Sequence, residues 1–290
     1  MTGGYGRSVS VLDRRQPTAV LACVVVTLAI SACGSDGGDR NGGAAGSPSP
    51  SPPVTLPEGA WRPMPGLRWE VRYQGEVDPS LDVDVWDVDL DDTSTGDIDR
   101  LHDADRKVVC YFSAGSYEDW RDDADRFPRG VIGKAYAGWP GEWWIDVRDP
   151  AVRPIMEARL DRAKAKGCDG VDPDNVNGFE NPTGFPLTAS DQLRYDRWLF
   201  DEAHRRGLAT SLKNDLPQVA ALVARVDFQV NEECIANDEC APLRRFIRAG
   251  KPVVGLEYEG DRASVCAEAR RFGFDTIIKH RDLDAHRIAC

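Results

Sequence analysis

Carboxylates, amides and a lysine follow several short apolar runs of this 290-residue sequence, at the points where those runs end. The most concentrated example is Gly167 to Gly178, G-C-D-G-V-D-P-D-N-V-N-G, which carries Asp172 and Asp174. Pro173 fixes its own φ and disfavours helix at Asp172, so both carboxylates are expected in an extended segment. Acidic groups at the C-terminal edge of strands often bind ligands or do chemistry, although a polar turn has the same composition.

The other expected strand ends carry the same kinds of side chain. Two carboxylates can serve as acid and as nucleophile or base at a glycosidic bond, and aromatic rings can support sugar faces. Lys213 also fits a structural ion pair, and the absence of G-x-S-x-G gives acyl transfer little support. The candidate site residues are Asp87, Asp89, Tyr111, Ser113, Asp172, Asp174, Asn175, Lys213, Asn214, Glu232, Glu257 and Tyr258.

A repeated pattern indicates which elements position these residues. Four times a helix-like stretch ends in basic residues and glycine and a β-rich run follows, as in A-K-A-K-G-C-D-G-V-D and A-R-R-F-G-F-D-T-I-I-K. Glycine suits the left-handed residue after a helix, and basic side chains suit the negative end of its dipole. Helix starts are expected at Asp149 with Pro150, and at Thr188 with Asp191 as a capping box.

Alternating strands and helices predict a parallel sheet. Eight strands are expected, near Glu70–Gln74, Val83–Val88, Val108–Ser113, Gly170–Asp172, Thr210–Lys213, Phe228–Asn231, Val253–Tyr258 and Asp275–Lys279. Eight strands close a (β/α)8 TIM barrel, so the fold class is α/β with one barrel domain over residues 61–290. Trp143–Val147 is expected to be a short extra strand. An open doubly wound sheet is the alternative, but the sequence has no G-x-G-x-x-G or P-loop.

The N-terminal residues have the pattern of an export signal. Two arginines precede the apolar run Ala19–Ile30, which is too short to span a bilayer. The ending I-S-A-C resembles the bacterial lipobox, so residues 1–33 are predicted to be a lipoprotein signal peptide with Cys33 lipidated; an ordinary signal peptide is the alternative. Residues 34–60 are predicted to be a flexible Gly/Ser/Pro linker. The protein is therefore expected to be exported and lipid-anchored outside the cell membrane, or secreted.

Charge and cysteine usage narrow the class further. A formal net charge of −12 argues against nucleic acid and is compatible with a cationic substrate. Six cysteines lie beyond Cys33, and an even number in an exported protein favours disulfides. Cys234 and Cys240 are close enough for a local bridge, Cys266 with Cys290 would fix the C-terminus, and Cys110 with Cys168 remain by elimination.

Neither a metal nor a cofactor is predicted from the sequence. No C-x-x-C or H-E-x-x-H occurs, and the four histidines are scattered. The acidic stretch D-V-D-V-W-D-V-D-L-D-D suggests calcium, but it does not match the EF-hand loop pattern.

Several segments resemble glycoside hydrolase family 114, whose members are described as endo-α-1,4-polygalactosaminidases. They are V-D-V-W-D-V-D-L-D-D-T, V-V-C-Y-F-S-A-G-S-Y-E-D-W, G-C-D-G-V-D-P-D-N-V-N-G-F, L-K-N-D, N-E-E-C and the later E-Y, in the family's order. The resemblance implies a (β/α)8 barrel that hydrolyses α-1,4-linked galactosamine-rich polymer without a cofactor, and it implies Asp174 and Glu232 as the catalytic pair. Asp172 stands where many relatives have glutamate, and Asn177 where aspartate is common, which bears on fine specificity.

We therefore expect an endo-acting glycoside hydrolase with a two-carboxylate mechanism, in which Asp87, Asp89, Lys213, Asn214 and Glu257 arrange the substrate. Galactosamine without its acetyl group is cationic, so an acidic cleft would attract it. A monomer with a polysaccharide partner is expected. A non-catalytic polysaccharide-binding lipoprotein, and a hydrolase for a different amino sugar or α-glycan, are the alternatives. The sequence does not determine which carboxylate is the acid or whether configuration is retained.

Overall fold

The computed structural model describes residues 52–290, so the predicted signal peptide, Cys33 and most of the predicted linker lie outside the described residues. One curled sheet contains eight parallel strands and a ninth, antiparallel strand at its end. In sheet order the strands are β1 (Trp69–Arg72), β2 (Val85–Asp89), β3 (Lys107–Ser113), β7 (Gly170–Asp174), β8 (Ala209–Lys213), β9 (Phe228–Glu232), β10 (Val253–Glu257), β11 (Asp275–Ile278) and β12 (Ile288–Ala289). The eight predicted strands are confirmed, with small shifts at their ends.

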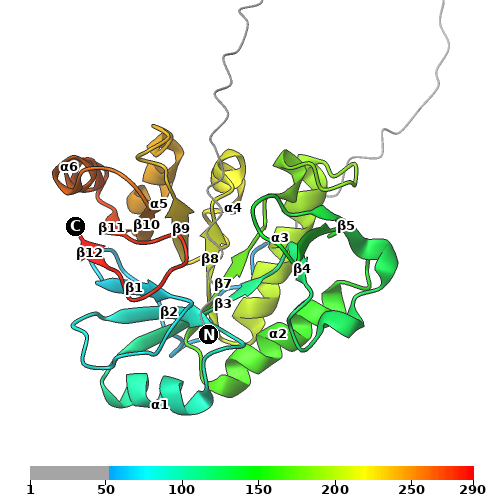
Figure 1. The fold of residues 1–290 in the computed structure, drawn as a ribbon, viewed down its shortest axis with the longest axis horizontal. Helices are drawn as coiled ribbons and strands as arrows, with labels where there is room; N and C mark the ends of the chain where they lie inside the picture. The colour runs from blue at the N-terminus through cyan, green and yellow to red at the C-terminus, as the bar shows by residue number, and fades with distance from the viewer. Residues whose placement is uncertain (1–51) are drawn as a thin grey trace, which may run out of the picture. The chain divides into compact units, whose positions relative to one another are not determined.

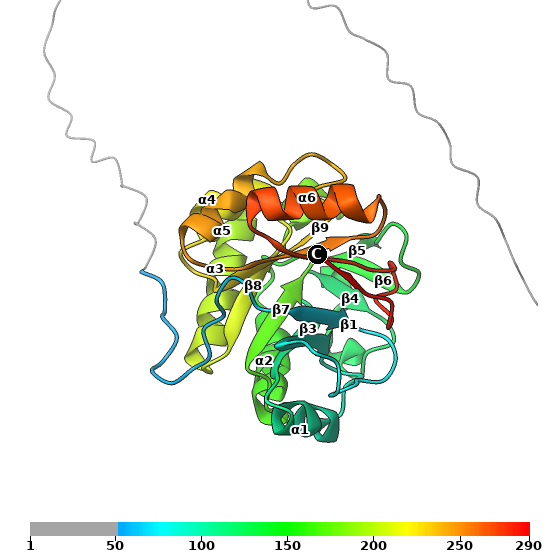
Figure 2. The same cartoon turned by 90° about the vertical axis from the view of Figure 1, so that its left-hand side faces the viewer.

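Helices cover the outside of the curled sheet (Figures 1 and 2). The α-helices of residues 52–290 are α1 (Thr95–Asp103), α2 (Arg153–Lys166), α3 (Ala189–Arg205), α4 (Val219–Leu222), α5 (Arg244–Arg248) and α6 (Arg262–Phe272). Short 3-10 turns are η1 (Ala124–Arg126), η2 (Arg129–Val131), η3 (Gly178–Glu180), η4 (Leu216–Gln218) and η5 (Ala241–Leu243).

The regular (β/α)8 pattern is wrong at two places in this part of the chain. The connection from β1 to β2 has no α-helix, because Gly75 and Pro79 interrupt it and both residues oppose helix. After β11 the chain turns back as β12 instead of forming a helix. The fold is therefore TIM-barrel-like, with an irregular region where its first and last strands meet.

The two predicted helix starts have different outcomes. Thr188 and Asp191 form a capping box at the start of α3, as predicted. The prediction at Asp149 is wrong, because α2 begins only at Arg153. The Asp149 carboxylate instead accepts a hydrogen bond of 2.8 Å from the Ala151 amide, so it stabilises a turn that precedes the helix.

A second, smaller sheet is inserted between β3 and α2. It is antiparallel, with the order β4 (Ser116–Glu118), β6 (Glu142–Ile145) and β5 (Ile132–Ala135). The predicted extra strand at Trp143–Val147 corresponds to β6, so it is a strand that lies outside the barrel sheet (Figure 1).

Two apolar clusters pack on the two faces of the curled sheet. Residues two apart on a strand share a face, so alternate side chains point to the barrel interior. The interior cluster includes Trp69, Val71, Val85, Val109, Ala209, Phe228, Val230, Val254 and Leu256. The cluster between the sheet and the helices includes Trp86, Val88, Leu101, Leu160, Leu199, Leu222 and Phe246.

The two ends of the parallel sheet meet through side chains and the C-terminal segment. Lys279 Nζ lies 2.8 Å from Glu70 Oε1, and both side chains are fully buried. The Tyr73 amide donates a hydrogen bond of 3.0 Å to the Leu283 carbonyl. A buried ion pair and a returning segment therefore join β1 to the chain that follows β11.

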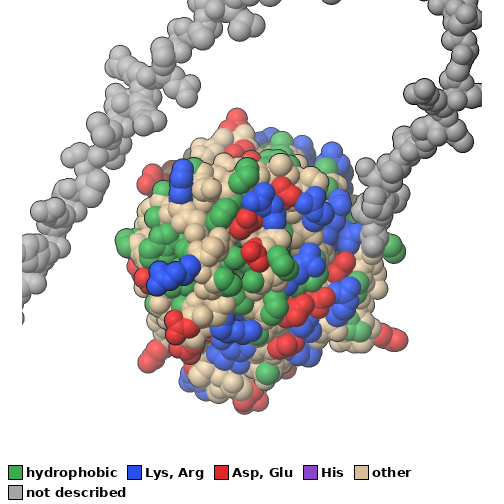
Figure 3. Space-filling view, turned by 90° about the vertical axis from the view of Figure 1, so that its right-hand side faces the viewer, with side chains coloured by type: hydrophobic (Ala, Val, Ile, Leu, Met, Phe, Trp, Pro, Cys, Tyr) green, Lys and Arg blue, Asp and Glu red, His purple; other side chains and the backbone are tan. Residues whose placement is uncertain are grey.

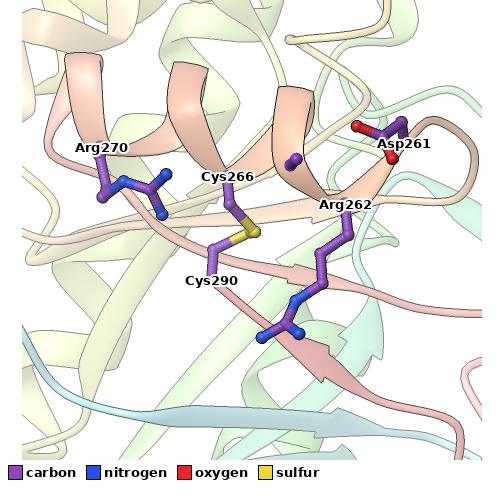
Figure 4. A pocket seen from close by; sticks show the side chains of 6 residues that line it. Asp261, Arg262, Cys266, Arg270 and Cys290 are labelled. Carbon is purple, nitrogen blue, oxygen red and sulfur yellow. A yellow bond between two sulfur atoms is a disulfide. The ribbon is translucent and has the colours of Figure 1, made fainter.

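Three disulfides lie within residues 52–290, and they confirm the predicted pairing. Cys266, at one end of the Cys266–Cys290 disulfide, is on α6, beside a hollow of about 390 Å³ that Arg262 and Arg270 help to line (Figure 4). The pairs are Cys110–Cys168, Cys234–Cys240 and Cys266–Cys290.

The folded domain begins earlier than the predicted boundary at residue 61. The Val54 amide donates a hydrogen bond of 3.1 Å to Asp201, and the Val54 carbonyl lies 2.6 Å from the His204 ring. Leu56 is buried in the interior cluster. The end of the predicted linker therefore packs against the barrel. No helix among residues 52–290 is long and apolar enough to cross a membrane.

Candidate active site

Polar side chains fill the C-terminal half of the barrel interior, directly above the apolar cluster. They follow the same inward alternation. Two residues after Val85 comes Asp87, two after Val109 comes Tyr111, and two after Val230 comes Glu232. We call these residues the polar cluster: Tyr73, Asp87, Tyr111, Asp172, Asp174, Ser211, Lys213, Glu232 and Tyr258.

Lys213 lies at the centre of the polar cluster. Its Nζ atom is 3.3 Å from Asp174 Oδ2 and 3.3 Å from Glu232 Oε2. Burial lowers the pKa of Lys213, but the carboxylates of Asp174, Glu232 and Asp172 outweigh burial and raise it well above its usual value. Lys213 is therefore a fixed positive charge. Because both oxygens touch the same nitrogen, they cannot be further apart than twice 3.3 Å.

Glu232 is held as a carboxylate at the end of β9. The Tyr258 hydroxyl donates to one oxygen, and Asn214 Nδ2 donates to the other at 3.1 Å. Asn214 Oδ1 in turn accepts the Glu232 amide at 2.9 Å, which fixes the residue at both backbone and side chain. Burial raises the pKa of Glu232, but Lys213, Tyr258 and Asn214 outweigh burial and lower it below its usual value. The side chain is still 27% exposed.

Asp174 ends β7 and faces the same space. The Tyr111 hydroxyl donates to Oδ2 at 3.2 Å, and the Asn175 amide donates to Oδ1 at 2.7 Å. The Asp174 carbonyl accepts the amides of Ala114 and Gly115 at 2.8 and 3.1 Å. Backbone contacts to the loop after β3 therefore fix this carboxylate, and its side chain is 18% exposed.

A buried polar network holds the residue that follows Asp174. Asn175 Nδ2 lies 2.9 Å from Ser113 Oγ, 3.1 Å from Ser116 Oγ and 3.0 Å from Glu142 Oε1. Asn175 has a left-handed backbone with φ 62°. A Cβ atom on Gly115 would lie 1.8 Å from the Asn175 carbonyl oxygen, so only glycine allows this close approach.

The same network changes the acidity of Glu142. Burial raises its pKa to about 7, hydrogen bonds from Ser116 and Asn175 oppose the rise, and the negative charge of Asp174 adds to it. Glu142 thus changes charge near neutral pH. It contacts Asn175, the residue that follows the candidate catalytic carboxylate Asp174.

Asp87 and Asp172 lie fully buried beneath the pair formed by Asp174 and Glu232. Asp172 accepts hydrogen bonds from Tyr73 and Ser211, and burial raises its pKa to about 6 although Lys213 opposes the rise. Neither Asp87 oxygen has a hydrogen-bond partner in residues 52–290, and burial with the nearby Asp172 charge raises its pKa well above the usual value. These fully buried carboxyls form the floor of the site, and their role in substrate binding stays a prediction.

The structure separates two predicted substrate-binding residues from the polar cluster. Asp89 accepts hydrogen bonds of 2.9 and 2.7 Å from Arg121, and this pair is buried. Glu257 accepts the amides of Ile235 and Ala236, at 2.9 and 3.2 Å. Tyr258 occupies the inward position next to Glu257, and Arg121 binds the Asp89 carboxylate. The role of Asp89 and Glu257 in substrate binding stays a prediction.

Sequence reasoning included Ser113 and Asn175 as substrate-binding residues, but their side chains are engaged in the buried network with Glu142. It missed Glu142 itself, which has no signal in the sequence. Tyr73 and Ser211 were also missed, although each lies two residues from an inward-facing neighbour on its strand and the alternation could have found them.

A curled parallel sheet whose C-terminal half holds exposed carboxylates is the arrangement of a TIM-barrel glycosidase. The family model described as glycoside-hydrolase family GH114 matches residues 51–290. The chain therefore belongs to glycoside hydrolase family 114 and is a glycosidase, as the sequence resemblance indicated.

Solved structures and one relative resemble this chain. Aspergillus fumigatus Ega3, solved in complex with galactosamine, is 36% identical, with a TM-score of 0.76 over 79% of this chain and 97% of that chain. The glycoside hydrolase domain of PelA from Pseudomonas aeruginosa shares the fold, with a TM-score of 0.64 at 15% identity over 78% and 98% of the two chains. An uncharacterised protein of Deinococcus radiodurans is 26% identical over 299 residues, which are 89% of this chain and 95% of that protein.

Proposed function

We propose that the protein is an endo-acting hydrolase of α-1,4-linked, galactosamine-containing polysaccharide and that Asp174 and Glu232 are its catalytic pair. The observation that carries the proposal is the pair of partly exposed carboxylates held on either side of Lys213. Membership of family 114 and the likeness to a protein solved with galactosamine support the choice of sugar.

The geometry favours retention of configuration. The Asp174 and Glu232 oxygens that share the Lys213 nitrogen lie no further apart than twice 3.3 Å, which is compatible with the roughly 5–5.5 Å separation in retaining enzymes and reaches only the lower limit of the roughly 6.5–9.5 Å in inverting ones. In that mechanism one carboxylate attacks the anomeric carbon while the other, protonated, gives its proton to the leaving glycosidic oxygen. Water then attacks the glycosyl–enzyme ester, the second carboxyl takes a proton from that water, and the first carboxylate is released.

The surrounding residues orient this pair. Tyr258 and Asn214 fix the two oxygens of Glu232, and Tyr111 fixes one oxygen of Asp174. Lys213 offsets the repulsion that these two partly exposed carboxylates would otherwise have, so both can lie close together. This arrangement is a reason to prefer catalysis over glycan binding alone, since a binding module has no need of a matched carboxylate pair.

Charge supports a cationic substrate over a neutral one. The chain has a formal net charge of −12, and unacetylated galactosamine carries an ammonium group. Acidic and basic side chains are interspersed on the face that Figure 3 shows, so the attraction is not concentrated in one patch there. The three disulfides within residues 52–290 are consistent with an oxidising, extracytoplasmic compartment. The proposed export signal and lipid anchor at Cys33 would place the protein in such a compartment.

The test is release of reducing ends by the purified protein from partly deacetylated α-1,4-galactosamine polymer. Fully acetylated polymer and a neutral α-1,4-glucan serve as comparisons, and Glu232→Gln is the control. We expect release that is fastest on the deacetylated polymer, disappears in the variant and gives a first product with retained α configuration by NMR. Binding without release would identify a binding module, and faster release from another polymer would identify a different substrate.

A further inference from the structure

Five buried acceptor oxygens lie between α3 and η4, outside the polar cluster. Within residues 52–290 none of them accepts a hydrogen bond. They are Gln192 Oε1, Asp196 Oδ2, Asp215 Oδ1, Asp215 Oδ2 and Gln218 Oε1. Each of the four side chains is at most 4% exposed, so bulk water does not satisfy these atoms. We call these four residues the oxygen cluster.

Several contacts bring the oxygen cluster together. Gln192 and Asp196 are one helical turn apart on α3, and Gln192 Nε2 donates to Asp196 Oδ1 at 2.8 Å. Gln218 Nε2 donates to the carbonyl of Ala189, the first residue of α3, at 2.9 Å, which fixes η4 against this helix. Asp215 immediately precedes η4, and its negative charge acts on Asp196. The unpartnered oxygens therefore come from two segments that pack against each other.

The charge of the oxygen cluster is not balanced by any described donor. The donor to the Asp196 carboxylate is the neutral amide of Gln192. The Asp215 oxygens have no hydrogen bond of ordinary geometry in residues 52–290, and the nearby backbone amide of Gln218, which lowers the pKa of Asp215, is also neutral. Burying two carboxylates without a counter-charge is costly, so they must either bind a cation or keep protons. Burial raises the pKa of Asp215 to about 8, and burial with the Asp215 charge raises the pKa of Asp196 well above its usual value.

We propose that the oxygen cluster is a structural calcium site, with Asp196 and Asp215 as charged ligands and the amide oxygens of Gln192 and Gln218 as neutral ones. Calcium is a hard cation that takes six to eight oxygens from carboxylates, amides and water, and it tolerates irregular geometry. The cluster offers no nitrogen or sulfur ligand, which disfavours zinc and copper. Magnesium demands near-octahedral geometry and keeps several waters, so it fits a closed protein cage less well.

The site would support the loop that holds the candidate catalytic pair in place. Lys213, Asn214 and Asp215 are consecutive, and the last two have left-handed backbones with φ 51° and 45°. Such conformations persist in residues other than glycine only where surrounding contacts impose them. An ion on Asp215 would fix the backbone next to Asn214, which binds Glu232. This consequence for activity rests on the proposed function, whereas the site itself does not.

The first test uses the purified wild-type protein, stripped of metal with EGTA and then titrated with calcium chloride. We expect one calcium per chain by metal analysis and isothermal titration. We also expect Tm to rise by roughly 5–10 °C when calcium is about 100 times its Kd. No calcium uptake, with Tm unchanged by either EGTA or calcium, would show that the carboxyls keep protons and would overturn the proposal.

Variants locate the site, with an exposed acidic group as the matched control. Asp215→Asn and Asp196→Asn should each abolish calcium uptake and the calcium-dependent rise in Tm; Gln192→Leu is a third variant in case either fails to fold.

A separate group of possible metal ligands lies at the surface of the described part of the chain: His280, Asp282 and Asp284. Asp282→Asn should leave uptake unchanged. Calcium uptake that depends on Asp282 and not on Asp196 or Asp215 would overturn the proposal. A higher Tm of both asparagine variants, with no calcium-dependent rise in the Tm of the wild type, would also overturn it. Polysaccharide cleavage is not part of this readout, so its failure and that of the proposed function are separable.

Discussion

The two halves of the barrel interior are built from the same strands with the same inward alternation, but they have different roles. The lower half is apolar and includes Trp69, Val85 and Phe228, all of which are fully or almost fully buried. The upper half, two residues further along, holds carboxylates around Lys213. The difference shows that one inward alternation places both the apolar and the charged side chains. Burial of the apolar lower half stabilises the barrel, whereas the upper half holds polar groups whose burial opposes folding.

The comparison is sharpest at the proposed catalytic pair, where the largest effect is expected. Asp174→Asn and Glu232→Gln should each lower kcat by roughly 10³-fold or more, because each removes a group that takes part in bond making. Their Tm should stay near that of the wild type, since both side chains are partly exposed. The measurement is turnover of an aryl glycoside of a galactosamine oligomer, beside thermal unfolding.

Added azide separates the roles within the pair. Where the nucleophile is missing, azide attacks directly and gives the inverted glycosyl azide; where the acid–base is missing, it attacks the glycosyl–enzyme and gives the retained one. The two variants should therefore give azides of opposite configuration. The same configuration from both, or wild-type turnover in either, would contradict the assignment.

Phe228→Ala tests the lower half. The ring is fully buried and its centroid lies 5.3 Å from that of Trp69. Its removal should lower the free energy of unfolding by about 3–5 kcal/mol through lost burial and a residual cavity. Turnover per folded molecule should be nearly unchanged. Urea unfolding and active-site titration measure the two quantities, and lost turnover with stability intact would mean that the two halves are not separable.

Glu142→Gln tests the network that connects the small sheet to Asp174. The folded-state pKa of Glu142 is raised to about 7, so its stabilising contribution is present at low pH and is lost as the pH rises through 7. The shift corresponds to at most about 3 kcal/mol. Glutamine cannot ionise, so the variant should show a flatter fall in the free energy of unfolding between about pH 4.5 and 7. The exposed Glu58→Gln serves as the control and should keep the wild-type slope.

Trp139→Ala should have the smallest effect. Trp139 is 52% exposed in the turn between β5 and β6, and its amide bonds the Tyr136 carbonyl at 3.3 Å. Burial and the charges of Asp174 and Glu142 raise the pKa of Tyr136, so this turn lies within electrostatic reach of the proposed catalytic pair. Loss of a sugar-stacking surface should raise KM roughly 3–10-fold with kcat unchanged. Met64→Ala, also exposed, is the control; equal effects from both would exclude a stacking role.

Much of the fold could be predicted because local signals coincide with it. Gly167 and Gly273 end their helices in left-handed conformations, as the repeated pattern of basic residues and glycine indicates. Alternation within each strand then predicts which side chains face inward. The missing helix after β1 has a local signal, because Gly75 and Pro79 oppose helix. The late start of α2 has none, because Asp149 and Pro150 match the pattern of a helix start although the helix begins at Arg153.

The candidate site was predictable only where a residue belongs to a strand. Asp174, Lys213 and Glu232 come together because parallel strands end at one edge. Asp89 and Glu257 have the same sequence context, yet Arg121 and the amides of the loop after β9 occupy their carboxylates. Those partners are distant along the chain or belong to the backbone, so residue type and spacing carry no information about them.

The contact between Lys279 and Glu70 has a consequence for how the chain acquires its structure. It joins residues 209 positions apart, so it forms only after nearly the whole barrel has been synthesised. Contacts of large sequence separation carry a high loop-closure entropy and slow the folding of two-state proteins. We expect an early state in which neighbouring strands have paired while the first and last strands are still apart. Such an open edge would need protection until it closes, and its closure would be the slow step on the way to the active enzyme.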